Sequence, residues 1–245
     1  MITCMYDGRI GNNIFQISSV MGMAIANKLE CGFEKWRYAH HFKNQLPELK
    51  RQTYYKVYEK NFHYNQYDIP DYNYELCGFF QSWKYFAHCE DVIRKQFEFS
   101  DAVKSKVKEK YGKIDKKTVA VHIRRGDYVK LADYHFNLPV DYYKKAMDEF
   151  DAHQFFVFSD EPAWCKAQDF GRQNITFIEG NDEGMDMCLM SQCSNFIIAN
   201  SSFSWWGAWL SKSKNKKVIA PLKWFAKAKM NKQTHDLIPE AWKKM

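Results

Sequence analysis

Residues 118–128 read Thr-Val-Ala-Val-His-Ile-Arg-Arg-Gly-Asp-Tyr. The first six are apolar or β-branched apart from one histidine, which is the pattern of a short strand buried on both faces. Two adjacent arginines and a Gly-Asp pair follow directly after it. A buried strand that leads into a charged turn is typical of α/β folds, whose functional side chains follow the strands.

The same alternation continues toward the C-terminus. Further strands are expected at 155–158, 175–178, 196–199 and 217–220, and helices at 140–150, after Pro162, at 184–192 and at 202–210. Strands that alternate with helices predict βαβ units and a parallel sheet.

Upstream of residue 118 the pattern is less regular. A strand is expected at 2–6, a helix at 12–28 after a glycine-bearing loop, a strand at 74–80, and helices at 85–97 and 100–111. Residues 33–73 show no clean period and are read as short strands and loops. A lysine-rich stretch that ends at 115–117 predicts a domain boundary, with domains 1–115 and 116–245. The predicted fold class is α/β.

Polar segments follow three of the predicted strands, where open parallel sheets bind ligands. They are residues 124–127, 159–161 and 200–202. The guanidinium groups of Arg124 and Arg125 are fixed cationic forks that suit a diphosphate, and Asp127 is placed to orient one of them. A surface salt bridge at a turn is the alternative interpretation.

Residues 199–207 read Ala-Asn-Ser-Ser-Phe-Ser-Trp-Trp-Gly. An amide and three hydroxyls, from Asn200, Ser201, Ser202 and Ser204, stand at the start of a predicted helix. Backbone N–H groups at a helix start bind anions, and hydroxyls reinforce such a site. The alternative is that Ser202 serves as an ordinary N-cap, and both readings can hold together.

Two further segments carry weaker signals. Ser159 and Asp160 end a strand, where a carboxylate can accept hydrogen bonds from a guanine edge or a ribose; Asp160 as a plain helix cap is the alternative. Residues 8–16 read Gly-Arg-Ile-Gly-Asn-Asn-Ile-Phe-Gln, which is not a dinucleotide fingerprint. Its glycines permit a tight turn that would present Arg9 and Asn12 into a cleft.

Charge and aromatic content narrow the choice of partners. The formal net charge is +7, with lysines concentrated at 104–117 and 212–232. Such runs are usually solvated faces, and otherwise they meet a nucleotide diphosphate, an anionic membrane or nucleic acid. Aromatic residues make up 17% of the chain, which suits either the binding of sugar faces or bases or an aromatic-rich core.

Several sequence patterns are missing, and their absence argues against other classes of protein. The seven cysteines form no C-x-x-C pair, which argues against a zinc site and indicates a reducing compartment. No two aspartates stand two apart, so the D-x-D pattern of metal-dependent transferases is missing, and phosphate charge is expected to be neutralised without a metal. The N-terminus is too short and polar for a signal peptide, and no apolar stretch reaches 18 residues, so a cytoplasmic protein is expected.

Together these segments resemble the α-1,2-fucosyltransferases of glycosyltransferase family 11. Residues 8–16 are similar to that family's G-x-L-G-N-Q-x-F-Q, residues 122–128 to its H-x-R-R-G-D-Y, and residues 159–164 to its S-D-D-x-x-W. Residues 186–210 match its long signature ending N-S-S-F-S-W-W, and residues 78–82 resemble a fifth segment. Asn13 departs from the family's usual glutamine, which shortens a side chain expected beside the cleft. Residues 33–73 match no family segment and are expected to govern acceptor choice.

The resemblance implies two Rossmann-like domains facing a cleft, the GT-B arrangement. The N-terminal domain would meet a β-galactoside acceptor, and the C-terminal domain would hold GDP-β-L-fucose as co-substrate. Transfer to the galactose 2-hydroxyl with inversion and without a metal cofactor is implied. The resemblance also implies the site roles. Arg124 would contact the β-phosphate with His122 beside it, Ser201, Ser202 and Ser204 would line the phosphates, and Asp160 would contact the guanosine. Arg9 and Asn12 would lie on the sugar side. The expected catalytic residues are Arg124, Asp127 and Asn12, and Arg125, Ser159 and Asn200 are expected among the donor-binding residues.

Asp127 is the candidate catalytic base, or else it only orients an arginine. Two other functions stay open at this point. One is a non-catalytic glycan- or RNA-binding protein, favoured by positive charge and aromatics. The other is a transferase on the same scaffold that uses another nucleotide sugar. The lysine-rich C-terminal segment also suggests peripheral contact with the inner face of a membrane, although solvated lysines explain it equally well.

Overall fold

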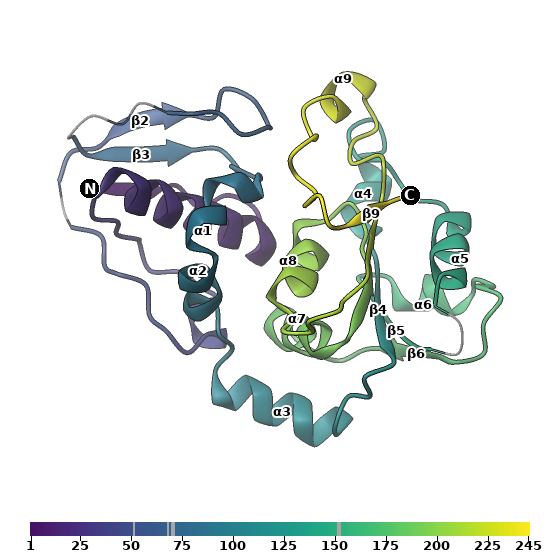
Figure 1. The fold of residues 1–245 in the computed structure, drawn as a ribbon. Coiled ribbons are helices and arrows are strands. Elements are labelled where there is room, and N and C mark those ends of the chain that lie inside the picture. Colours follow the sequence, from purple (N-terminus) through teal and green to yellow (C-terminus); the bar gives the residue numbers. More distant parts are fainter. Residues whose placement is uncertain (51, 68, 70–71, 151–152) are drawn as a thin grey trace. The chain divides into compact units, whose positions relative to one another are not determined.

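The computed structural model describes residues 1–50, 52–67, 69, 72–150 and 153–245. The chain forms two compact units (Figure 1). The first unit comprises Met1–Asp101 and Gln233–Pro239, and the second comprises Ala102–Lys232 and Glu240–Met245. A few residues of the irregular stretch 33–73 lie outside the described ranges.

The first unit is built on a three-stranded parallel sheet in the order β1-β3-β2. Its strands are β1 (Ile2–Cys4), β3 (Tyr74–Cys77) and β2 (Tyr55–Tyr58). Helix α1 (Ile10–Asn27) packs against β1, and its residues from Ile10 to Ala24 are buried apart from Asn12; it ends at Lys28 in the left-handed conformation. The remaining helical elements are η1 (Ala39–His41), η2 (Trp83–Tyr85), η3 (Ala87–Cys89) and α2 (Glu90–Gln96).

The second unit is built on a six-stranded sheet, and all its paired strands run parallel. The strands are β4 (Thr118–Ile123), β5 (Gln154–Ser159), β6 (Ile175–Ile178), β7 (Asn195–Ile197), β8 (Val218–Ala220) and β9 (Lys243–Lys244). Their order is β6-β5-β4-β7-β8-β9, which is the 3-2-1-4-5-6 order of Rossmann folds. The direction of winding therefore reverses between β4 and β7.

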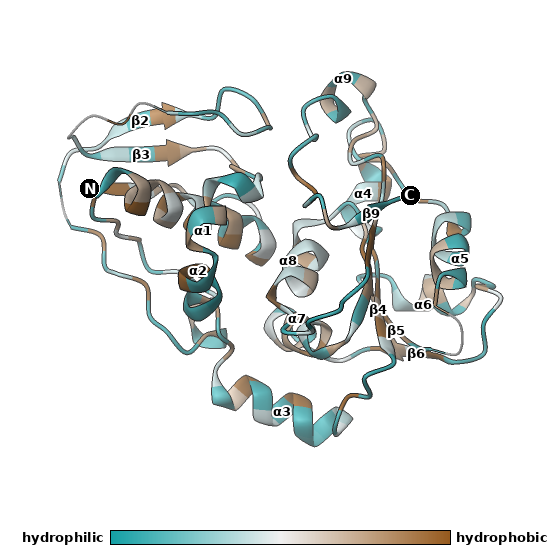
Figure 2. Ribbon diagram, in the orientation of Figure 1, coloured by the Kyte–Doolittle hydropathy of each residue, from teal (hydrophilic) through white to brown (hydrophobic). Residues whose placement is uncertain are grey.

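Helices cover both faces of this sheet, as a parallel sheet requires. The helices that the structure describes in this part of the chain are α3 (Asp101–Tyr111), α4 (Gly126–Lys130), α5 (Val140–Asp148), α6 (Pro162–Lys166), α7 (Glu183–Gln192), α8 (Ser202–Leu210) and α9 (Ala228–Asn231). Helices α5 and α6 lie on one face, and α7 and α8 on the other (Figure 1). All six residues of β4 are buried, which confirms the strand predicted from the opening stretch. Figure 2 shows this central strand region as brown, in contrast to the mostly hydrophilic α3.

The units differ from the predicted domains at the linker. The expected boundary at residue 115 lies beyond α3, whereas α3 goes with the second unit apart from Asp101. The Lys110 ammonium group donates to the carbonyl oxygens of Glu179 and Gly180, and Asn181 donates to the Tyr111 hydroxyl at 2.8 Å. These contacts explain the assignment, because they attach the end of α3 to the loop after β6.

The C-terminal segment Gln233–Pro239 also departs from the predicted domains, since it packs in the first unit. The Tyr64 N–H donates to Asp236 Oδ2 at 2.9 Å, and the Ser82 hydroxyl donates to the Asp236 carbonyl at 3.3 Å. The chain then returns to the second unit and adds β9 at its edge.

Candidate active site

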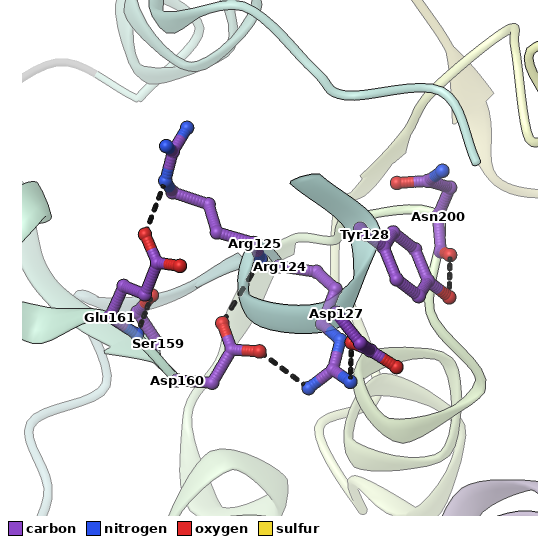
Figure 3. Close-up of polar contacts among 8 residues, drawn as sticks. All are labelled: Arg124, Arg125, Asp127, Tyr128, Ser159, Asp160, Glu161 and Asn200. Carbon is purple, nitrogen blue, oxygen red and sulfur yellow. Dashed lines mark hydrogen bonds and ion pairs between the residues drawn. The ribbon is translucent and has the colours of Figure 1, made fainter. Parts of the chain in front are cut away.

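The carboxyl ends of β4, β5 and β7 bring three sequence segments together. Strand β4 pairs with β5 so that Ile123 lies opposite Ser159, and it pairs with β7 on its other side. The Tyr128 hydroxyl donates to the Asn200 carbonyl at 3.1 Å, which links the loop after β4 to the loop after β7 (Figure 3). This is the point where the strand order reverses, at which open α/β sheets bind ligands.

Arg124 is held on two sides by carboxylates. Its Nη1 lies 2.7 Å from Asp160 Oδ2, and its Nη2 forms an ion pair with Asp127 Oδ1 (Figure 3). Its Cζ lies 5.1 Å from the centroid of the Tyr128 ring. With only 14% of its side chain exposed, the guanidinium group has a fixed orientation rather than a solvated, mobile one.

Arg125 points in the opposite direction in Figure 3. Its Nε donates to Glu161 Oε2 at 2.8 Å, and its Cζ lies 3.6 Å from the centroid of the Trp164 ring. The structure therefore does not bring the two guanidinium groups together as the paired forks that the sequence suggested. The side chain of Arg125 stacks and pairs at α6, so its predicted contact with the donor has no support from this geometry.

Asp160 positions the loop after β4. Its Oδ1 accepts a hydrogen bond from the Arg125 backbone N–H at 3.0 Å, while its Oδ2 pairs with Arg124. Gly126 has φ +36°, and a Cβ there would lie 2.5 Å from Asp160 Oδ2, so glycine permits this close approach. Next to Asp160, the Ser159 hydroxyl accepts from the Glu161 N–H at 3.0 Å, which fixes the turn after β5.

His122 is a buried, neutral imidazole in β4. Burial, with a smaller effect from the positive charge of Arg124, lowers the pKa of His122 to about 3. Among the described residues its Nδ1 has no hydrogen-bond partner, and its ring lies 5.3 Å from that of Phe203 in α8. A neutral ring nitrogen next to Arg124 can accept or donate one further hydrogen bond.

Two side chains of the predicted hydroxyl-lined helix start, those of Asn200 and Ser204, donate to backbone carbonyls of the chain itself. The Asn200 amide donates to the carbonyls of Phe136 at 2.9 Å and Trp224 at 2.7 Å, which uses both of its N–H donors. Ser204 is fully buried, and its hydroxyl donates to the Ser201 carbonyl at 3.2 Å. Both side chains therefore hold the loop, which the sequence alone could not distinguish from ligand contact.

Ser201, not Ser202, is the N-cap of α8. Ser202 is the first residue of the helix, so the prediction that Ser202 is the N-cap is wrong. Within the described residues the Ser201 side chain makes no capping hydrogen bond. Ser202 is only partly buried in the first turn, where the N–H groups of a helix lack intrahelical partners and attract anions. The candidate anion site at this turn thus consists of backbone donors with Ser201 and Ser202.

Arg9 and Asn12 belong to the first unit. Arg9 is exposed at the N-cap position of α1, and Asn12 Oδ1 accepts a hydrogen bond from Gln81 Nε2 at 2.9 Å. Gly8 has φ +76°, and a Cβ there would lie 2.2 Å from the Asn12 amide nitrogen, so the turn requires glycine. The loops after β1 and β3 thus meet at Asn12.

Asn13 is not a side chain beside a cleft, as the sequence led us to expect. It is buried, and its amide donates to the Asp7 carbonyl at 2.9 Å and to Gln16 Oε1 at 3.1 Å. Its Oδ1 accepts from Trp36 Nε1 at 3.1 Å. Asn13 therefore holds the glycine turn from inside the unit.

Sequence reasoning assigned no role to Tyr128, which contacts both Arg124 and the loop after β7. Burial raises the pKa of its phenol to about 12, so the hydroxyl stays protonated and donates to Asn200. The His135 ring stacks on Tyr128 with centroids 3.7 Å apart. The position of Tyr128 two residues after Gly126 was a usable signal, whereas nothing in the sequence indicated His135.

No group of three or more His, Cys, Asp or Glu side chains that could hold a metal ion occurs in the described part of the chain. No described helix has the length and apolar character needed to cross a bilayer.

The profile of the family described as Glycosyl transferase family 11 matches residues 1–244. The chain belongs to glycosyl transferase family 11. This match confirms the resemblance inferred from the sequence motifs.

Two curated relatives show the range of activities among similar proteins. An α-1,2-colitosyltransferase of Escherichia coli is 37% identical over 189 residues, which cover 69% of this chain and 61% of the relative. Galactoside 2-α-L-fucosyltransferase Sec1 of Mus musculus is 27% identical over 237 residues, which cover 86% of this chain and 64% of the relative. The chain thus spans less than two thirds of the length of each of these two proteins.

Among solved structures, the fucosyltransferase NodZ from Bradyrhizobium matches with a TM-score of 0.59 and 11% identity, over 84% of this chain and 91% of NodZ. A NodZ crystal soaked with GDP-fucose matches with a TM-score of 0.57 and 11% identity, over 85% of this chain and 92% of NodZ. At this identity the likeness establishes an α/β fold with parallel sheets.

Proposed function

We propose that this family 11 chain transfers L-fucose from GDP-β-L-fucose to the 2-hydroxyl of a terminal β-galactoside, with inversion and without a metal ion. The observation that carries the proposal is Arg124, fixed by two carboxylates at the strand-order reversal. Family membership and the names of the relatives support the reaction class. In this proposal the second unit takes the donor and the first unit takes the acceptor, as in a GT-B enzyme. Arg9 of the first unit would contact the donor sugar, and Asn12 would be one of the catalytic residues.

The role of Arg124 in the proposed transfer follows from where negative charge develops during the reaction. As fucose departs with oxocarbenium character, negative charge grows on the β-phosphate of GDP. A donor that is fixed in advance stabilises this charge more in the transition state than in the ground state, which accelerates the step. We assign that task to Arg124, with the first turn of α8 and its Ser201 and Ser202 hydroxyls on the diphosphate.

The acceptor hydroxyl must also lose a proton. Asp127 is the candidate base by its carboxylate and its exposure, but its contact with Arg124 supports the orienting role instead. Likewise both Asp160 oxygens contact the loop after β4, which supports a positioning role beside the predicted guanosine contact.

A second donor is favoured by one finding, the 37% identity to a colitosyltransferase. Colitose is L-fucose without its 3-hydroxyl. A site built to hydrogen-bond that hydroxyl rejects the deoxy sugar by about 10⁴–10⁵-fold in kcat/KM, whereas a pocket without such partners discriminates weakly. Comparing kcat/KM for GDP-fucose and GDP-colitose identifies the natural sugar.

The deciding experiment incubates the purified chain with GDP-fucose and lactose, with and without EDTA. We expect release of GDP and a trisaccharide whose new linkage is α-1,2 by NMR, at equal rates in both conditions. Arg124→Ala is the matched inactive control. Tight, salt-sensitive RNA binding without turnover of either nucleotide sugar would instead support a non-catalytic nucleic-acid-binding protein.

We also infer that the chain works in the cytoplasm, at the periphery of the inner membrane face. The lysine clusters of the sequence support this location.

A further inference from the structure

The second unit exposes an apolar surface that no part of the proposed reaction uses. It is formed by residues 129–134, at the end of α4 and the following turn, and by residues 222–232, which include α9; we name it the α4–α9 patch. Leu222 is 66% exposed and Leu131 is 52% exposed, and Val129 and Tyr134 are also exposed. Exposed large apolar side chains on two segments that contact each other mark an interaction surface.

The two segments of the patch are held together by their backbones. The Ala226 N–H donates to the Tyr134 carbonyl at 2.9 Å, and His135 forms a β-bridge with Phe225. Trp224 and Phe225 are buried, and both of their N–H groups donate to Asn231 Oδ1, at 2.8 and 2.9 Å. The exposed side chains of the patch are therefore presented by an ordered frame.

The same surface is strongly cationic. Its two segments contain five lysines against one aspartate, Asp133; the lysines are Lys130, Lys223, Lys227, Lys229 and Lys232. Lys223 lies over the Phe136 ring at 5.1 Å. The exposed side chains of Lys227 and Lys229 have no carboxylate partner among the described residues. An anion from outside the chain can therefore reach them.

We infer that the α4–α9 patch docks on a bilayer that contains anionic phospholipid. Exposed leucines that enter the headgroup region, flanked by lysines that meet anionic headgroups, are the two components of peripheral membrane binding. Nucleic acid would use the lysines but would leave Leu222 and Leu131 without a partner. A symmetric dimer through the patch would place like charges against each other.

The α4–α9 patch lies close in sequence to the proposed donor site, which bears on the kind of acceptor that the chain can reach. Helix α4 starts at Gly126, two residues after Arg124, so docking through α4 would hold the donor site close to the bilayer surface. We therefore infer that the natural acceptor is a glycan on a lipid carrier, an inference that rests on the proposed transferase function.

The test measures co-sedimentation of the full chain with vesicles of phosphatidylcholine, with and without about one third phosphatidylglycerol. We expect binding to the anionic vesicles only. Lys227→Glu/Lys229→Glu should weaken it on the order of 25-fold or more, because each lysine near an anionic surface contributes about fivefold. Leu222→Ser should weaken it about tenfold through lost apolar insertion. The matched control is Lys106→Glu/Lys108→Glu, the same charge change on exposed lysines of α3, which should bind as the wild type does.

Three results would overturn the inference: no binding to anionic vesicles, an equal loss in the α3 control, or a loss confined to the lysine variant together with competition by duplex RNA. Turnover is measured in parallel with lactose and with an octadecyl lactoside embedded in the vesicles. Patch variants should keep the rate with lactose and lose rate with the embedded acceptor. Vesicle binding without turnover of lactose would refute the proposed function alone, and turnover without vesicle binding would refute the docking alone.

Discussion

The role on the β-phosphate that we propose for Arg124 can be tested by substitution, because two carboxylates hold its guanidinium group in one orientation. Arg124→Lys keeps the charge but cannot bond Asp160 and Asp127 from one rigid fork. We expect kcat with GDP-fucose to fall by about 10²-fold or more, the size seen when one transition-state donor is removed. Arg125→Lys is the control and should lose less than about tenfold, because Arg125 pairs with Glu161 instead. Similar kcat values for both variants would show that Arg124 has no special part in the reaction.

A substitution at Asp127 distinguishes a role in orienting Arg124 from a role as the catalytic base. Since its carboxylate contacts Arg124, we expect Asp127→Asn to lower kcat by about tenfold, well short of the upper range for a lost base. The acidic limb of the pH–rate profile should keep its position. If that limb disappears in the variant, Asp127 is the base and the orienting role is wrong.

Gly126 tests whether Asp160 positions the loop. Gly126→Ala would place a Cβ 2.5 Å from the Asp160 carboxylate, whereas Gly112→Ala, at φ +68°, meets nothing within 4 Å. Both substitutions should lower the free energy of unfolding by about 1–2 kcal/mol because of positive φ. Only Gly126→Ala should also lower kcat, which thermal unfolding and steady-state kinetics measure separately. An unchanged kcat in Gly126→Ala would mean that the Asp160 contact does not matter for turnover.

At the scale of elements, the lysine-rich segment after α8 is not only a solvated face. The Lys216 ammonium group donates to the carbonyls of Ala208, Trp209 and Ser211 at 2.8–3.2 Å, at the end of α8 where carbonyls lack intrahelical partners. Lys216→Met should therefore lower the free energy of unfolding by about 1–3 kcal/mol in urea titrations. Lys212→Met, at an exposed lysine in the same segment, should change it by less than about 0.5 kcal/mol. Equal changes in unfolding free energy for the two variants would show that Lys216 behaves as an ordinary solvated lysine.

Helix α7 carries a carboxylate whose titration couples to folding. Burial raises the pKa of Asp186 to about 6, partly offset by a hydrogen bond from Asn181. The folded state then binds a proton more tightly than the unfolded state, so this contribution to stability is present at low pH and is lost as pH rises from about 4 to about 6. The difference in unfolding free energy between the wild type and Asp186→Asn should fall over that range. A difference independent of pH would show that Asp186 titrates normally.

Across the whole molecule, the sequence predicted best the elements whose own residues form a short apolar run with clear ends. Strands β4 and β6 and helix α8 have the predicted bounds, since their apolar runs are short and sharply ended. Strand β2 lies in the irregular stretch because it is largely exposed, and β9 is a pair of exposed lysines added at the sheet edge. At the site, the predicted ends of the strands gave the correct positions of Arg124 and Asp160 in the fold. The direction of Arg125 depends on Trp164 and Glu161 of another βα unit, which no local pattern shows.

Donor binding by the whole molecule tests whether a cation is needed beside the diphosphate. If Arg124 and the first turn of α8 supply all the charge that a diphosphate needs, GDP should stabilise the fold equally with EDTA and with Mn²⁺. At a GDP concentration 100 times its Kd, the gain in unfolding free energy should be about 2.7 kcal/mol, visible as a rise in Tm. Hydrogen exchange should slow at residues 123–128 and 200–204, and Arg124→Ala should lose most of the Tm rise. A rise that requires Mn²⁺ would show that a cation neutralises the diphosphate, and that the guanidinium and helix donors are insufficient for it.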